Sequence, residues 1–218
     1  MVFIILVATI LVAVGIEVLF LRKKRALAHV NEHSSSPVVF NRSSLEIPEG
    51  YHFSPGHTWA KEDSGKLNIG IDAFVLKALG NLKIDKLTPA GNSIKKGDVI
   101  FEATANSKRV KFRSPVDGTI DFVNNKIIGK QLTDVYGENW GVKVTAGSDQ
   151  IARLLSDGAA LDWMKSEFRR LKDFLSFNSF KAEPIGATMY DGGNVVEGVV
   201  SDFDEDLVVE FEENFLTF

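Results

Sequence analysis

The feature that most constrains the fold is a series of short strand-like segments between positions 67 and 145. β-Branched, aromatic and other apolar residues gather in these segments, and Gly, Pro and Asn stand between them, which is typical of short strands joined by turns. One helix fits among them, from Asp72, a suitable N-cap, to Leu79, just before Gly80. We therefore expect a mainly β domain, a small barrel or sandwich. The expected strands are 67–71, 82–87, 98–103, 109–113, 118–123 and 141–145.

The composition excludes several kinds of chemistry. The 218 residues include no cysteine, which excludes disulfides, thiolate metal ligation and thiol catalysis. The sequence also lacks a Gly-rich phosphate loop and a serine elbow. A net charge of −4 does not favour nucleic acid as a partner. We expect a protein that is not an enzyme, has no metal site and binds no nucleic acid.

The N-terminal segment has the length and composition of a membrane anchor. An apolar run extends from Met1 to Leu21, and a helix of about twenty such residues crosses a bilayer. A basic cluster follows the run, formed by Arg22, Lys23, Lys24 and Arg25. Positive residues stay on the cytoplasmic side, so the pattern predicts an external N-terminus and cytoplasmic residues 22–218. A cleaved signal peptide is the alternative, but no positive region precedes the run. We expect a single-pass protein of a bacterial inner membrane, in contact with lipid, with a linker over residues 22–50 whose segment Val38–Phe40 could pair locally with the domain.

Six motifs follow one another along the body of the chain. They are "GHTW" at 56–59, "IGIDAFVLKALGNL" at 69–82, "LTPAGNSIKKGD" at 87–98, "RSPVDGTI" at 113–120, "DVYGENWGVKV" at 134–144 and "DQIARLLSDGAALDWM" at 149–164. In this order they resemble the H protein of the glycine cleavage system, the lipoyl carrier. The resemblance covers roughly residues 50–175 and implies a barrel-sandwich hybrid with a closing C-terminal helix over residues 51–176. In this family His57 and Trp59 belong to the framework.

The lysine that carries lipoate in the family is absent from its expected position. The resemblance implies a Glu-Ser/Thr-Val-Lys-Ala motif whose lysine stands eight residues before the turn proline. In this sequence, counting eight residues back from Pro115 gives Ser107, and Thr104 stands in the place of the glutamate. Lys108 stands one residue late, and a slip of one residue in a hairpin turns the side chain away. Either the lipoyl arm is lost and the domain serves for docking, or the turn has shifted register and Lys108 carries lipoate. We expect no cofactor, with lipoate as the alternative.

The same hairpin carries several positive charges. We expect them to form one solvated basic face that deters edge aggregation and could meet an acidic partner or anionic lipid. This basic hairpin face comprises Lys108, Arg109, Lys111 and Arg113.

The C-terminal part of the chain predicts a helix and then an acidic extension over residues 177–218. Leu161, Met164, Phe168, Leu171 and Leu175 form an apolar stripe at helical spacing, which predicts a helix packed on the β domain. Segments 194–200 and 207–213 resemble two strands, so the extension is expected to be a hairpin or a docking arm. The residues expected to dock on a partner are Phe174, Phe177, Phe180, Phe211 and Phe215.

These observations predict a non-catalytic accessory or scaffolding subunit of an inner-membrane complex, which uses a non-lipoylated H-protein-like domain to bind the other subunits. The alternative is a membrane-tethered carrier of glycine-cleavage type with lipoate on Lys108. A third possibility is a delivery protein that holds lipoate without a covalent bond.

Overall fold

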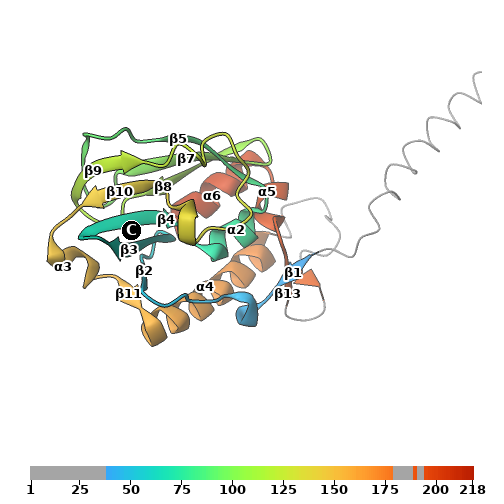
Figure 1. The fold of residues 1–218 in the computed structure, drawn as a ribbon. Helices are drawn as coiled ribbons and strands as arrows, with labels where there is room; N and C mark the ends of the chain where they lie inside the picture. Colours follow the sequence, from blue (N-terminus) through green and yellow to red (C-terminus); the bar gives the residue numbers. More distant parts are fainter. Residues whose placement is uncertain (1–37, 179–188, 191–193) are drawn as a thin grey trace, which may run out of the picture. The chain divides into compact units, whose positions relative to one another are not determined.

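The computed structural model describes residues 38–178, 189–190 and 194–218, and Val38–Phe218 belong to one compact unit (Figure 1). The predicted anchor Met1–Leu21, the basic cluster after it and Phe180 lie outside the described residues. Among the residues that are described, no helix is both long enough and apolar enough to cross a membrane.

Three sheets and several helices make up the described fold. The largest sheet has the order β11-β2-β3-β4-β10-β9-β6, a second has the order β5-β7-β8, and a third has the order β1-β13-β12. The strands are β1 Val39–Phe40, β2 Tyr51–Phe53, β3 Thr58–Asp63, β4 Lys66–Ile71, β5 Leu82–Leu87, β6 Ser93–Ile94, β7 Val99–Ala105, β8 Lys108–Arg113, β9 Gly118–Val123, β10 Val142–Thr145, β11 Leu155–Ser156, β12 Met189–Tyr190 and β13 Asn194–Val196. The α-helices are α2 Ala73–Leu79, α3 Ser148–Ile151, α4 Asp157–Asn178, α5 Val199–Asp202 and α6 Glu205–Phe215.

The β body has the predicted elements. Each of the six expected strands is present, with ends within two residues of the expected ones. The helix α2 is also confirmed, because the Asp72 side chain accepts a hydrogen bond from the Val75 N–H at 3.1 Å. At the other end the Gly80 N–H donates to the Leu76 carbonyl at 2.8 Å.

The centre of the large sheet is packed around Trp59. Its side chain is 1% exposed, and its indole N–H donates to the carbonyls of Ile71 at 2.8 Å and Val135 at 2.9 Å. The indole lies so close to Gly70 that a Cβ there would be 2.3 Å from the ring. A glycine is therefore required opposite Trp59 in the β3–β4 pair.

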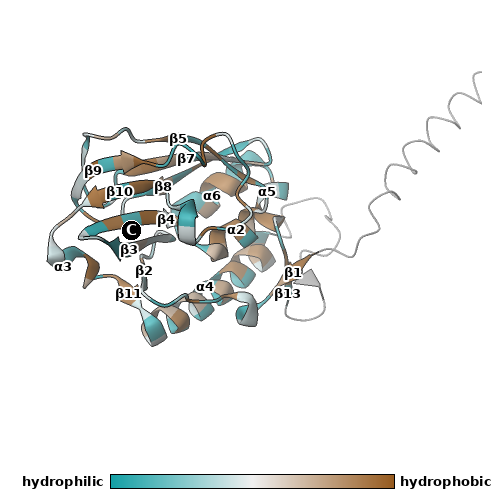
Figure 2. Ribbon diagram, in the orientation of Figure 1, coloured by the Kyte–Doolittle hydropathy of each residue, from teal (hydrophilic) through white to brown (hydrophobic). Residues whose placement is uncertain are grey.

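The helix predicted from the apolar stripe packs on the β body as expected. Along α4, polar and apolar residues fall on different faces (Figure 2). Met164, Phe168, Leu171 and Leu175 are at most 2% exposed, and Phe168 meets Phe40 edge-on at 5.5 Å between ring centroids.

Phe40 belongs to the segment that was expected to be a linker. Strand β1 pairs with β13, with Val39 opposite Val196, and Leu45 is 3% exposed. The compact unit therefore begins at Val38, before the expected boundary at residue 51.

The acidic extension was predicted wrongly. Residues 194–196 are a strand, but α5 and α6 follow, and α6 spans the whole of the second expected strand. The alternation of Val209, Glu210, Phe211 and Glu212 imitates a strand over four residues only. Leu207, Val208, Phe211 and Phe215 form a buried helical stripe, and Asp204 caps the helix by accepting from the Leu207 N–H at 2.9 Å. Residues 194–218 of the extension therefore fold onto the domain rather than projecting as an arm.

Candidate functional site

The hairpin between β7 and β8 is the place where the sequence predicts a lost or displaced lipoyl lysine. Ala105 pairs with Lys108, which leaves Asn106 and Ser107 as a two-residue turn. Both turn residues have positive φ, 46° and 72°, as a type I′ hairpin turn requires. Ser107 is exposed at the tip, whereas Lys108 is the first residue of a strand. The lysine is thus one residue past the tip, as the count from Pro115 predicts.

The Lys108 side chain is held against the C-terminal extension. Its Nζ donates to the carbonyl of Ser201 in α5 at 2.5 Å, and the side chain is only partly exposed. The Asn106 amide donates to the same carbonyl at 3.4 Å and to the Asp202 carboxylate at 3.3 Å. The helix α5 therefore covers the inner side of the hairpin tip.

A close contact between two glycines fixes α5 in this position. A Cβ on Gly80, at the end of α2, would lie 2.7 Å from the Gly198 Cα. The Gly198 N–H donates to the Lys77 carbonyl at 2.8 Å, and the Lys77 ammonium lies 2.7 Å from the Glu197 carboxylate. The cover over the hairpin thus rests directly on the β body.

The four residues of the predicted basic hairpin face do not share one face. Lys108 has the same parity along β8 as Val110 and Phe112, which are buried. Arg109, Lys111 and Arg113 fall on the opposite side, because successive side chains of a strand alternate. The prediction is corrected for Lys108, which leaves a basic row of three.

The predicted aromatic docking residues are mostly internal. Phe211 is 0% exposed and Phe215 is 2% exposed, and their rings stack at 4.8 Å. Phe174 is partly buried, with its ring centroid 5.8 Å from that of Phe215. Only Phe177, at 66% exposed, lies at the surface among the described members of the set. Phe211 and Phe215 join α6 to α4 and are not available to a partner.

A buried ionic network of His57, Asp72 and Glu167 joins the β body to α4. Glu167 was not among the residues singled out from the sequence. The His57 Nδ1 lies 2.7 Å from the Asp72 carboxylate, and its Nε2 lies 3.6 Å from the Glu167 carboxylate. Arg170 donates to both oxygens of Glu167, at 2.8 and 2.7 Å. The His57 ring also stacks on Phe74 at 4.5 Å.

The charge state of this network follows from its contacts. Burial alone would lower the pKa of His57, and this is the largest single effect. The charge and hydrogen bond of Asp72, together with the nearby Glu167 carboxylate, outweigh it and raise the pKa to about 9. Burial raises the pKa of Glu167, but the nearby His57 and the hydrogen bonds from Arg170 give a net lowering. His57 is therefore a cation held between two carboxylates, with no exposed surface from which to act on a substrate.

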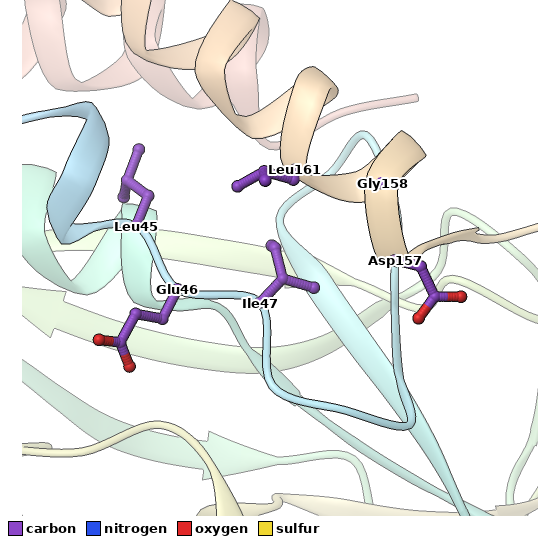
Figure 3. A pocket seen from close by; sticks show the side chains of 6 residues that line it. All are labelled: Leu45, Glu46, Ile47, Asp157, Gly158 and Leu161. Carbon is purple, nitrogen blue, oxygen red and sulfur yellow. The ribbon is translucent and has the colours of Figure 1, made fainter.

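A shallow cavity of about 450 Å³ lies beside the first turn of α4 (Figure 3). Ile47 and Leu161 point toward one another across it, whereas the carboxylates of Glu46 and Asp157 point away. Leu161 of the predicted apolar stripe thus lines a surface hollow. The described residues contain no cluster of three or more His, Asp or Glu that could hold a metal.

Comparison with known proteins decides the family. The model of the glycine cleavage H-protein family matches residues 51–167, just over half of the chain. The chain belongs to the glycine cleavage H-protein family. The glycine cleavage system H protein of Bifidobacterium longum is 30% identical over 117 residues, which are 52% of this chain and 85% of that protein. The H protein of Chlorobium limicola is 30% identical over 120 residues, 53% of this chain and 94% of the relative.

A solved structure is also similar. The glycine cleavage system H protein of Mycobacterium marinum has a TM-score of 0.46 at 21% identity, over 55% of this chain and 99% of that one. Both the expected family and the expected mainly β, H-protein-like fold are confirmed by the family match.

The match to the family ends before α5 and α6, the C-terminal helices that lie over the hairpin. Residues 51–167 include the hairpin and the His57 network, whereas α5 and α6 lie beyond them. At the hairpin tip Ser107 has no amine, and the nearest amine, that of Lys108, donates to the Ser201 carbonyl. This chain therefore combines an H-protein body with an added C-terminal segment that lies on its hairpin.

Proposed function

We propose that this protein is a non-catalytic accessory subunit that uses an H-protein-like domain without a lipoyl arm to bind other proteins. The observation that carries the proposal is the hairpin tip, where Ser107 is exposed and Lys108 donates to the Ser201 carbonyl. A carrier arm has to project freely to reach its partners, and here the nearest amine is held by α5.

The segment that covers the hairpin, α5 and α6, is packed firmly against the rest of the domain. Val200 and Phe211 are 0% exposed and Phe203 is 2% exposed, so lifting the extension would expose several large apolar side chains. Each such side chain contributes about 1.5–3 kcal/mol when buried. A ligase would have to overcome this stabilisation before Lys108 could enter its active site.

The membrane part of the proposal rests on sequence alone. The apolar run Met1–Leu21 and the basic cluster that follows it have the length and charge of a single-pass anchor with a cytoplasmic body. A tethered domain without a freely projecting arm is suited to holding subunits of an inner-membrane complex together. We expect the partners to be those subunits.

A second candidate function is that of a membrane-tethered lipoyl carrier with lipoate on Lys108. Its relatives are glycine cleavage system H proteins, which favours this function over a purely scaffolding role. Lys108 is partly exposed and lies one residue from the tip, so the two candidates differ in whether α5 releases it.

Enzymatic modification in vitro tests the proposal. The full-length protein in detergent is incubated with lipoate, ATP and a lipoate–protein ligase, and its intact mass is measured. The H protein of Chlorobium limicola serves as the positive control. We expect the control to gain lipoyl mass and this protein to gain none.

A pair of variants makes the result specific. Ser107→Lys places an amine at the exposed tip and should be modified more than the wild type, while Lys108→Arg should behave as the wild type. Full modification of the wild type that disappears in Lys108→Arg would instead establish the carrier function.

A further inference from the structure

A groove lies between the outer face of the β5-β7-β8 sheet and α6, and we name it the β8–α6 groove. Its volume is about 830 Å³. Arg109, Lys111 and Arg113 of β8 line one side of it. Glu205, Glu212 and Glu213 of α6 line the other side.

The two sides of the groove carry opposite charges but form no ion pair across it. None of these six side chains has an ion-pair partner within 4.0 Å among the described residues. Two of the cations, Arg109 and Lys111, are exposed, as are Glu205 and Glu213. The sheet side also carries Asp85, Lys86 and Glu102, but Lys86 pairs with Glu102 and Asp85 pairs with Lys83, each at 3.2 Å. The groove thus has a net basic side and an acidic side that are both open to a ligand.

The backbone of β8 adds a second reason to expect a ligand with an extended backbone. Strand β8 is at the edge of its sheet, since the order is β5-β7-β8. The backbone N–H of Lys111 donates to the Glu212 carboxylate at 3.1 Å, a side-chain acceptor in the place of a neighbouring strand. An edge strand of this kind accepts an added strand through its backbone groups.

We propose that the β8–α6 groove binds an extended segment of a partner protein in which acidic and basic residues alternate. In an extended chain, successive side chains point to opposite sides, so alternation directs carboxylates to the β8 side and cations to the α6 side. Val209, which is 49% exposed on α6, offers an apolar contact within the same groove. This inference rests on the proposed function, because it names the surface with which the accessory subunit holds its partner.

The probe is a capped, fluorescein-labelled peptide of about six Glu-Lys repeats, long enough to span a strand of β8's length. The control peptide has the same composition with all Glu residues before all Lys residues. Binding to the full-length protein in detergent is followed by fluorescence anisotropy at low salt, with protein that was never exposed to lipoate. We expect the alternating peptide to bind about tenfold more tightly than the block peptide, and salt to weaken both.

Charge-reversal variants locate the site. Arg109→Glu with Lys111→Glu should weaken binding of the alternating peptide by about tenfold or more, a change of about 1.4 kcal/mol. The matched control, Lys126→Glu with Lys130→Glu, alters the net charge equally at two exposed lysines that do not line the groove. It should leave the affinity within about twofold, the size of a general charge effect.

Three results would overturn the inference: equal weakening by both double variants, equal affinity for the two peptides, or no binding of the alternating peptide up to about 1 mM. Since the assay uses unmodified protein, it succeeds or fails independently of whether a ligase can modify Lys108. If a ligase modifies the protein and the peptide still binds, the proposed function is contradicted and the inference about the groove stands.

Discussion

The buried histidine makes the stability of this domain depend on pH in an unusual direction. The pKa of His57 is about 9 in the folded protein and 6.5 in the unfolded chain, so the folded state binds the proton more tightly. At about 1.4 kcal/mol per pKa unit, protonation contributes about 3 kcal/mol to the free energy of unfolding. The contribution is fully present below pH 6.5 and is lost as the pH rises through about 9. We therefore predict that stability falls across this alkaline window.

Urea unfolding of the full-length protein in detergent, followed by tryptophan fluorescence, measures the effect. The midpoint should fall between about pH 6.5 and about pH 9.5, equivalent to about 3 kcal/mol. His57→Gln should be less stable at pH 6.5 and should lose most of this slope. His52→Gln is the matched control, since its ring has no carboxylate within 4.0 Å among the described residues and the slope should remain.

Two outcomes would refute this reasoning. A wild-type midpoint that is flat or rises across the window would show that His57 is not protonated between Asp72 and Glu167. A slope that His57→Gln shares with the wild type would assign the effect to other groups.

Further predictions concern the cover and its packing. Gly80→Ala should destabilise the protein by about 1–3 kcal/mol more than Gly65→Ala in thermal unfolding. Both glycines have positive φ, 69° and 76°, but only the Cβ at position 80 would meet another backbone. Equal effects of the two substitutions would contradict the contact between Gly80 and Gly198. Phe211→Ala should cost about 3–5 kcal/mol in urea unfolding because it leaves a cavity between α4 and α6. Phe177→Ala, at a site 66% exposed, should cost less than a third of that, and the reverse order would place Phe211 at the surface.

The β body could be predicted because its signals are local. The six strands follow from short runs bounded by turn residues, and α2 follows from the Asp72 cap and Gly80 within one segment. The displaced Lys108 could be predicted from the lysine position that the family resemblance implies, by a count along a single hairpin. Neither result required knowledge of which distant segments meet.

The contacts that decide the site are distant in sequence, and they could not be predicted. Lys108 and Ser201 are 93 positions apart, and no local pattern links them. The partnership of His57 with Glu167 depends on how α4 docks, and Glu167 looks like an ordinary polar residue of an amphipathic helix. The α6 segment was misassigned because Val209–Glu212 alternate like a strand, whereas the helical stripe Leu207, Val208, Phe211 and Phe215 shows only over a longer segment.

The measurement that tests the central claim most directly is the intact mass of the full-length protein purified from the membranes of the cells that make it, with the co-purifying subunits identified. The account predicts the mass of the unmodified chain together with stoichiometric membrane partners. A mass increased by one lipoyl group, located on Lys108 by peptide mapping, would contradict it and identify a membrane-tethered carrier.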